Sequence, residues 1–234
     1  MRTSPRVLAC VGAAAAAVIL LSSCTTINNL DRYRMENASL AADMGVPPRP
    51  RLDIDYSVHI DSRNPIATAL SVGTTIIKAS EAEKAEAYMR EALETVDVPA
   101  IVLKETARAC AAALDARLVG RGQRADYLLE LDIREYGIQA PSWGSAVSLH
   151  LRMVASLYHT RSRDIVWRRS ITVDDPANPQ MFASGHIIGN IVTAGVLSSL
   201  TVEELEEGFR ALCFESARSL TRRLERDFYR ASYR

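Results

Sequence analysis

The stretch Ala125-Asp-Tyr-Leu-Leu-Glu-Leu-Asp-Ile-Arg134 decides the fold class of this chain. Its apolar residues Tyr127, Leu129, Leu131 and Ile133 alternate with polar residues from Glu130 to Arg134. Successive side chains of a strand point to opposite faces, so this period of two predicts a strand buried on one face only.

Three further stretches have the same alternation, and we predict strands at residues 52–60, 147–155 and 165–173. The connection at residues 159–164 is short, which predicts that the last two strands form an antiparallel hairpin. Clean alternation in every strand indicates a sheet with one face covered by helices and one polar face.

Helical patterns surround these strands. We expect a short helix over residues 27–44, a helix over 80–95 with a capping box at Ser80 and Glu83, a helix from Pro99 to Gly120, and a long helix capped by Thr201 and Glu204. The prediction is an α+β two-layer sandwich with a mostly antiparallel sheet of about four strands, helices on one face and a helical insertion.

The N-terminus has the features of an export signal. Arg2 and Arg6 precede an apolar run over residues 7–21, which is short for the ~20 residues that span a bilayer. The run ends in Leu21-Ser22-Ser23-Cys24, which resembles the lipobox of bacterial lipoproteins.

The lipobox resemblance implies a defined modification. Cleavage falls between Ser23 and Cys24, Cys24 carries a diacylglyceryl thioether, and fatty acids such as palmitate acylate the new amine. Several acyl chains make a stable membrane anchor, whereas one chain is marginal. Thr25, a residue other than Asp, implies sorting to the outer membrane, on its periplasmic side. The alternative is an ordinary secretory signal.

The expected organisation has three parts. Residues 1–23 are a signal peptide and residues 24–50 are a lipidated tether, stiffened by three prolines at 47–50. Residues 51–234 form one α+β domain, with a helical insertion at about 65–97 and an apolar segment at 181–200.

Composition limits the function. Lys+Arg and Asp+Glu are both 28 among 234 residues, and this balance gives no sign of nucleic-acid binding. Cys10 leaves with the signal and Cys24 is the anchor, which leaves Cys110 and Cys213. In an oxidising compartment this pair is a possible disulfide, but both lie on apolar helical faces, where separate buried thiols are also common.

The sequence contains no nucleophile elbow, zinc-protease motif, phosphate-binding loop or Cys-x-x-Cys pair. We therefore expect no enzyme activity, no metal site and no cofactor. One set of residues is the alternative, because carboxylates and imidazoles gathered on the polar sheet face can bind a metal or transfer protons: Asp53, Asp55, His59, Glu130, Asp132, His150 and Arg168. The simpler interpretation is a solvated sheet face.

Two apolar segments, residues 65–78 and 181–200, have three possible roles. They are part of the core, they form a surface that docks a partner or a membrane, or the second of them spans the membrane. The basic and aromatic C-terminal run is either the solvated side of a helix or a contact for anionic lipid or an acidic partner.

The residues Ala125 to Leu131, followed by the hairpin that ends in Ile165-Val166-Trp167-Arg168-Arg169, resemble a group of small α/β envelope lipoproteins. That group includes auxiliary lipoproteins of ABC-type lipid transport and the lipopolysaccharide-assembly lipoprotein. The resemblance implies a non-enzymatic, lipid-anchored accessory protein that docks to an envelope transport or assembly complex. The alternatives are an oligomer-forming structural or secretion-type lipoprotein and an envelope hydrolase or metal-dependent enzyme.

Overall fold

The computed structural model describes residues 26–54, 65–120, 122–140, 147–176 and 200–233, and in the long helix at residues 65–95 it describes side chains from Ser80 onward. The signal peptide, Cys24, Asp55, His59 and the apolar segment up to residue 199 lie outside the described residues. Among the helices that are described, none has the combination of length and apolar character that crossing a bilayer requires.

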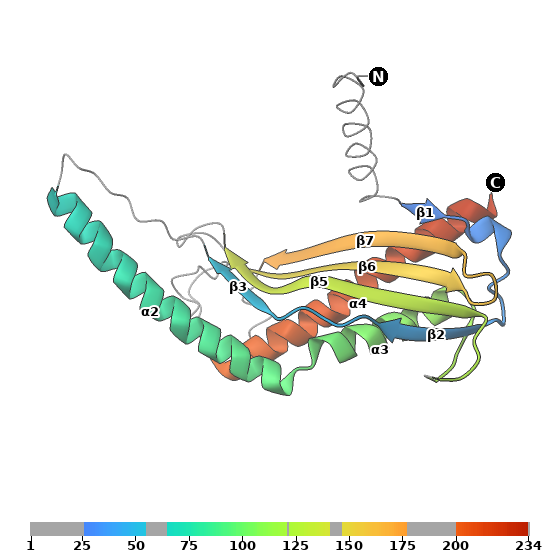
Figure 1. The fold of residues 1–234 in the computed structure, drawn as a ribbon, viewed down its shortest axis with the longest axis horizontal. Coiled ribbons are helices and arrows are strands. Elements are labelled where there is room, and N and C mark those ends of the chain that lie inside the picture. Colours follow the sequence, from blue (N-terminus) through green and yellow to red (C-terminus); the bar gives the residue numbers. More distant parts are fainter. Residues whose placement is uncertain (1–25, 55–64, 121, 141–146, 177–199, 234) are drawn as a thin grey trace, which may run out of the picture.

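A seven-stranded mixed sheet forms one layer and two long helices lie along one face of it (Figure 1). The strands are β1 (Ile27–Asn28), β2 (Ser39–Met44), β3 (Arg51–Ile54), β4 (Arg117–Leu118), β5 (Tyr127–Ala140), β6 (Ser148–His159) and β7 (Ile165–Pro176). The helices are η1 (Leu30–Arg32), α2 (Pro65–Thr95), α3 (Val98–Ala113) and α4 (Val202–Ser232). The sheet order is β1-β7-β6-β5-β2-β4, with β3 also paired to β5.

The centre of the sheet is the predicted antiparallel part. β5 pairs with β6, and β6 pairs with β7, in antiparallel register. The predicted hairpin at residues 159–164 is therefore confirmed. The alternating apolar residues at the start of β5 are buried, with Leu131 completely so.

A parallel edge completes the sheet, which the prediction of about four mostly antiparallel strands missed. β2 runs parallel to the first half of β5, and β3 runs parallel to its second half. Parallel neighbours need a long crossover connection. Here α2 and α3 provide it, because they lie between β3 and β5 in the chain.

The predicted helix over residues 27–44 is wrong. This segment forms β1, η1 and β2, and Leu40 of β2 pairs with Tyr127 and is completely buried. The alanines of this segment favour a helix in isolation, but pairing along β5 overrides that preference. Residues 27–44 of the expected tether therefore supply two strands of the sheet and the short helix η1.

Helix α4 contributes the largest part of the helical layer to the core. Its buried residues include the whole predicted apolar face, which consists of Leu205, Phe209, Leu212, Cys213, Ser216, Leu220 and Leu224. The predicted capping box is present, since the Thr201 side chain accepts from the Glu204 backbone N–H at 3.2 Å and the Glu204 carboxylate accepts from the Thr201 N–H at 2.8 Å.

Two other predicted helix ends are wrong. Ser80 lies in the middle of α2 rather than at its start, because the preceding residues continue the same helix. The helix expected to run from Pro99 to Gly120 ends at Ala113, and Leu118 belongs to β4 with 45% of its surface exposed. The N-cap residue of α3 is Asp97, whose side chain accepts a hydrogen bond from the Ala100 N–H.

A buried polar cluster fastens the end of α4 to β7. The Oδ2 atom of Asp227 accepts hydrogen bonds from Trp167 Nε1 at 2.9 Å and from Arg169 Nε at 2.6 Å. Asp227 is only 5% exposed and Trp167 is completely buried. Burial raises the pKa of the Asp227 carboxyl, but the bonds from Arg169 and Trp167 outweigh it and hold this pKa below its usual value.

Candidate functional site

The structure places the described members of the predicted polar set on the sheet face opposite α3 and α4. They alternate with the buried residues of their strands and are Asp53, Glu130, Asp132, His150 and Arg168. We call this surface the outer sheet face. The remaining two members, Asp55 and His59, lie outside the described residues.

The imidazole of His150 lies between two carboxylates on the outer sheet face. Its Nε2 is 3.2 Å from Glu135 Oε1, and its Nδ1 is 2.5 Å from Asp174 Oδ1. The two ring nitrogens point to opposite sides, so these carboxylates do not converge on one point. Among the described residues, no group of three or more His, Cys, Asp or Glu side chains is placed to hold a metal ion.

Two other members of the predicted set bind close neighbours. Asp132 pairs with Arg134 at 2.6 Å, and Arg168 donates to Ser156 Oγ at 2.9 Å and to Tyr158 Oη at 3.2 Å. The predicted set is therefore spread over the face, and those members that have partners form separate local pairs. Such short-range pairing is the usual behaviour of a solvated sheet face.

The sequence pattern missed Glu135 because the register of β5 changes beside it. An irregularity between Ile133 and Glu135 adds one residue to β5 relative to β6. A bulge of this kind shifts the alternation, so a residue expected on the buried side turns outward. Asp174 was missed because the predicted strand ended at residue 173.

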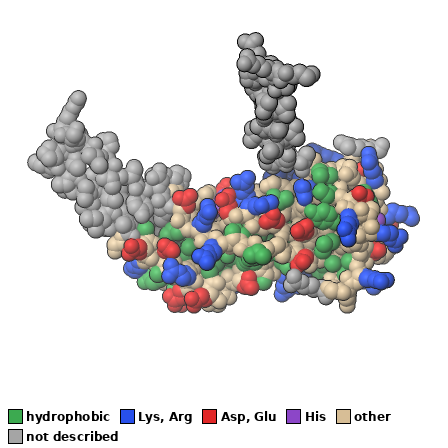
Figure 2. Space-filling view, in the orientation of Figure 1, with side chains coloured by type: hydrophobic (Ala, Val, Ile, Leu, Met, Phe, Trp, Pro, Cys, Tyr) green, Lys and Arg blue, Asp and Glu red, His purple; other side chains and the backbone are tan. Residues whose placement is uncertain are grey.

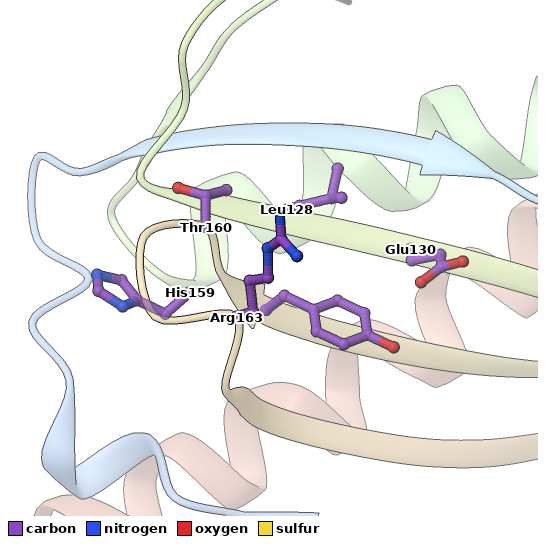
Figure 3. Close-up of a pocket in the computed structure, with 6 residues that line it drawn as sticks. Leu128, Glu130, His159, Thr160 and Arg163 are labelled. Atoms are coloured by element: carbon purple, nitrogen blue, oxygen red, sulfur yellow. The ribbon is translucent and has the colours of Figure 1, made fainter.

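The described surface is hollowed where the β6–β7 turn meets the start of β5. Two adjoining depressions of about 460 and 510 Å³ share His159 and Thr160. Figure 3 shows the Arg163 side chain reaching over the start of β5 toward Leu128. We call this region the turn-end surface, and its lining residues are Ser39, Arg124, Ala125, Asp126, Leu128, Glu130, Tyr158, His159, Thr160, Arg161 and Arg163.

Reciprocal hydrogen bonds between β2 and β5 shape one side of the turn-end surface. Asp126 Oδ2 accepts from Ser39 Oγ at 2.6 Å and from the Ser39 N–H at 2.9 Å, while the Asp126 N–H donates to Ser39 Oγ. The side-chain bond from Ser39, followed by the backbone bond, lowers the pKa of the Asp126 carboxyl. The Asp126 carboxyl is therefore ionised, and its role is structural, because it accepts the hydrogen bonds that join β2 to the start of β5.

A cluster of aromatic rings packs against the β6–β7 turn. The His159 ring lies 5.5 Å from both the Tyr33 and the Tyr127 ring centroids, and the two tyrosine rings meet edge to face at 6.4 Å. The Tyr127 hydroxyl donates to the Arg34 carbonyl at 2.9 Å. These contacts tie the β6–β7 turn to the segment between η1 and β2.

The turn also brings together a serine, a histidine and an aspartate. His159 Nδ1 lies 2.8 Å from Ser162 Oγ, and the Asp164 carboxylate accepts from the Tyr33 hydroxyl at 3.1 Å. Hydrogen bonds from Ser162 and then Tyr33 lower the pKa of the Asp164 carboxyl. In a catalytic triad the aspartate binds the histidine, which in turn activates the serine. Here the Asp164 carboxylate binds the serine and the tyrosine and not the histidine. The three residues are therefore not arranged as a triad, and their hydrogen bonds stabilise the turn.

Three arginines stand on the turn-end surface with their guanidinium groups exposed. Arg124, Arg161 and Arg163 form no ion pair with any carboxylate in the described part of the chain. Figure 2 shows basic side chains gathered at the end of the molecule where this turn lies. Several arginines elsewhere pair with a nearby carboxylate, as Arg90 does with Glu86. This end is therefore available to bind acidic groups.

The two remaining cysteines are free and buried. Cys110 Sγ lies 3.9 Å from Thr221 Oγ1, and Cys213 Sγ donates to the Val98 carbonyl at 3.8 Å. Burial raises the pKa of each thiol to about 12. In this structure the possible disulfide between them is not formed, and each thiol has its own partner.

No family model and no curated protein sequence match the chain. Among solved structures, the fold is similar to protein XCC0632 from Xanthomonas campestris, described as DUF330, with a TM-score of 0.38 and 15% identity over 82% of this chain and 88% of that chain. It is also similar to the PelC dodecamer from Paraburkholderia phytofirmans, with a TM-score of 0.31 and 12% identity over 78% of this chain and 94% of that chain. Both similarities are low, so only the residues of this chain carry the functional argument.

Proposed function

We propose that this chain is a non-enzymatic lipoprotein, anchored through Cys24 on the periplasmic side of the outer membrane, that docks to an envelope transport or assembly complex. The observation that carries the proposal is the lipobox Leu21-Ser22-Ser23-Cys24 placed directly before the domain. Ile27 already pairs with Arg168 in the sheet. A lipid on Cys24 would therefore hold the edge of the domain against the membrane.

The turn-end surface is the contact that we assign to the protein partner. Of its two carboxylates, Asp126 is occupied by hydrogen bonds from Ser39, and Glu130 is outnumbered by three arginines. The neighbouring Asp164 is occupied by bonds from Ser162 and Tyr33. The arginines of the turn-end surface make no ion pair among the described residues, so their donors are available to a partner. Guanidinium groups form strong bidentate bonds with carboxylates, which favours an acidic segment of a partner protein.

A triple replacement tests this contact. Arg124→Gln, Arg161→Gln and Arg163→Gln together remove three charges, and the processed lipoprotein is then crosslinked in membranes and purified in mild detergent. We expect the variant to lose its partner. The matched control replaces Arg90, Arg108 and Arg210 with Gln, three exposed arginines on the helices that pair within their own helix, and it should keep the partner. Equal recovery of the partner from both triple variants would contradict the assignment.

Self-association is the second candidate function, and the open edge of β7 favours it. β1 pairs with β7 only at Trp167 and Arg168, and no other described strand lies beside the remaining edge. A strand with free backbone N–H and C=O groups is a template for another chain. A discrete multiple of the protomer mass in mild detergent would support this function, and a monomer bound to a different protein would support docking.

A further inference from the structure

The C-terminal end of α4 presents an exposed aromatic and basic face that the turn-end surface does not include. Tyr229 and Tyr233 are 64% and 74% exposed, and their ring centroids lie 4.6 Å apart. Arg226 and Arg230 are also exposed and form no ion pair with a carboxylate of the described residues. We call these four residues the α4-end surface.

Helical geometry places the α4-end surface opposite the buried side of α4. Residues three or four apart in a helix share one face, so Arg226, Tyr229, Arg230 and Tyr233 form one stripe. The buried residues of the same turns are Leu224, Asp227 and Ala231. The hydrogen bonds that Asp227 accepts from Trp167 and Arg169 fix the rotation of the helix, and the stripe therefore faces away from the sheet. One acidic residue, Glu225, lies at its margin.

The α4-end surface is close to the point where the chain enters the domain. Asn28 Nδ2 donates to the backbone carbonyl of Asp227 at 3.1 Å. Figure 1 shows β1 beside the C-terminal end of α4. Cys24 lies four positions before Asn28 in the sequence, and a chain of that length spans at most about 14 Å. A lipid attached to Cys24 would therefore hold this end of α4 within reach of the headgroups.

We propose that the α4-end surface docks to the anionic phospholipid headgroups of the membrane that holds the anchor. This inference rests on the lipidation of Cys24 that the proposed function includes. Tyrosine is enriched at the membrane interface because its ring is apolar and its hydroxyl is polar. Arginine adds attraction to anionic lipid and hydrogen bonds to phosphate oxygens. The surface thus sets the orientation of the domain, which one flexible anchor cannot do.

A tryptophan introduced into the stripe reports its depth. The processed, lipidated chain with Tyr233→Trp is reconstituted into vesicles of phosphatidylcholine with brominated phosphatidylglycerol. The parent chain, which contains Trp143 and the buried Trp167, supplies the background. We expect the bromine atoms to quench the introduced tryptophan. The matched control is Phe214→Trp, at an exposed aromatic position of the same helix roughly 28 Å away, which should not be quenched.

Charge removal separates headgroup binding from simple proximity. Arg226→Gln and Arg230→Gln should each lower the ratio of docked to undocked domains by about fivefold in anionic vesicles. Neither should change the quenching in vesicles that contain only brominated phosphatidylcholine. Raised salt should have the same effect as the replacements, because it screens exposed charges.

The outcomes separate this inference from the proposed function. The mass of the chain shows whether Cys24 carries lipid, and a missing lipid refutes the anchor. If a lipidated chain with Tyr233→Trp is quenched no more than one with Phe214→Trp, the membrane contact is refuted while the anchor stands. The membrane contact would also be refuted if bromine did not quench the Tyr233→Trp chain but its tryptophan were shielded in another way. Shielding that depends on added acidic protein would indicate a protein occupant, and shielding that depends on protein density would indicate a second copy of the chain.

Discussion

Removal of the Asp227 charge should destabilise the protein, because this carboxylate joins α4 to β7. Asp227→Asn keeps the shape of the side chain but leaves the Arg169 guanidinium without its counter-ion, and the Arg169 side chain is only 21% exposed. Breaking one half of a buried ion pair costs about 3–5 kcal/mol, and the partial exposure of Arg169 reduces this to about 2–3 kcal/mol. Urea unfolding followed by circular dichroism measures the loss.

The pH dependence of this loss tests its cause. The pKa of Asp227 is lower in the folded protein than its usual value. The stabilisation is therefore complete above the unfolded pKa, at about 3.9, and is lost as the pH falls through the folded pKa. The difference between Asp227→Asn and the parent protein should be full at neutral pH and should narrow in acid.

Two controls complete the experiment. Glu215→Gln removes a carboxylate that pairs with Arg218 and Arg222 on the exposed side of α4 and should cost less than about 1 kcal/mol. The double replacement Asp227→Asn with Arg169→Met removes both charges, keeps an acceptor for Trp167 Nε1 and should restore most of the stability that Asp227→Asn alone loses. The reasoning would be refuted if Asp227→Asn were as stable as Glu215→Gln at neutral pH, or if its deficit did not change with pH.

Three further replacements or treatments test other parts of the fold. Gly137 has φ +149°, and a Cβ there would clash with the Arg51 carbonyl oxygen. Gly137→Ala should therefore lower the free energy of unfolding by at least about 2 kcal/mol. Gly45 has open space around it, so the control Gly45→Ala should change this free energy by less than ~0.5 kcal/mol. Thr201→Ala removes the N-cap bond of α4 and should cost about 1 kcal/mol in thermal or urea unfolding, and an unchanged midpoint would contradict the role of the cap. Cys110 and Cys213 are buried with pKa values of about 12, so a thiol reagent at about pH 8 should modify neither in the folded, processed chain and both in urea, and rapid labelling without urea would show that the helical layer opens.

The sequence predicted the elements whose pattern is set by burial alone. The strands around Leu131, Leu151 and Ile171 each have one face against the helices, and their alternation reveals them. The apolar face and the cap of α4 follow the same logic, since both depend on residues within the helix. These local signals predicted the antiparallel centre of the sheet and its helical cover.

The elements that depend on distant partners were missed. The residues around Leu40 favour a helix locally and become a strand only because β5 offers an unpaired edge. The Asp227 cluster joins residues 58 and 60 positions apart, and no local pattern indicates it. The turn-end surface likewise combines Ser39 with Asp126 and His159, which only the finished sheet brings together.

The N-terminal residue of the processed chain tests the central claim most directly. Intact-mass and peptide mass spectrometry of the protein isolated from membranes measure where the chain begins and what it carries. We predict that Cys24 is the first residue, with a diacylglyceryl group on its sulfur and a fatty acid on its amine, and that Cys24→Ser gives an uncleaved, unlipidated precursor. A mature chain that begins elsewhere, or a Cys24 without lipid, would contradict the lipoprotein assignment.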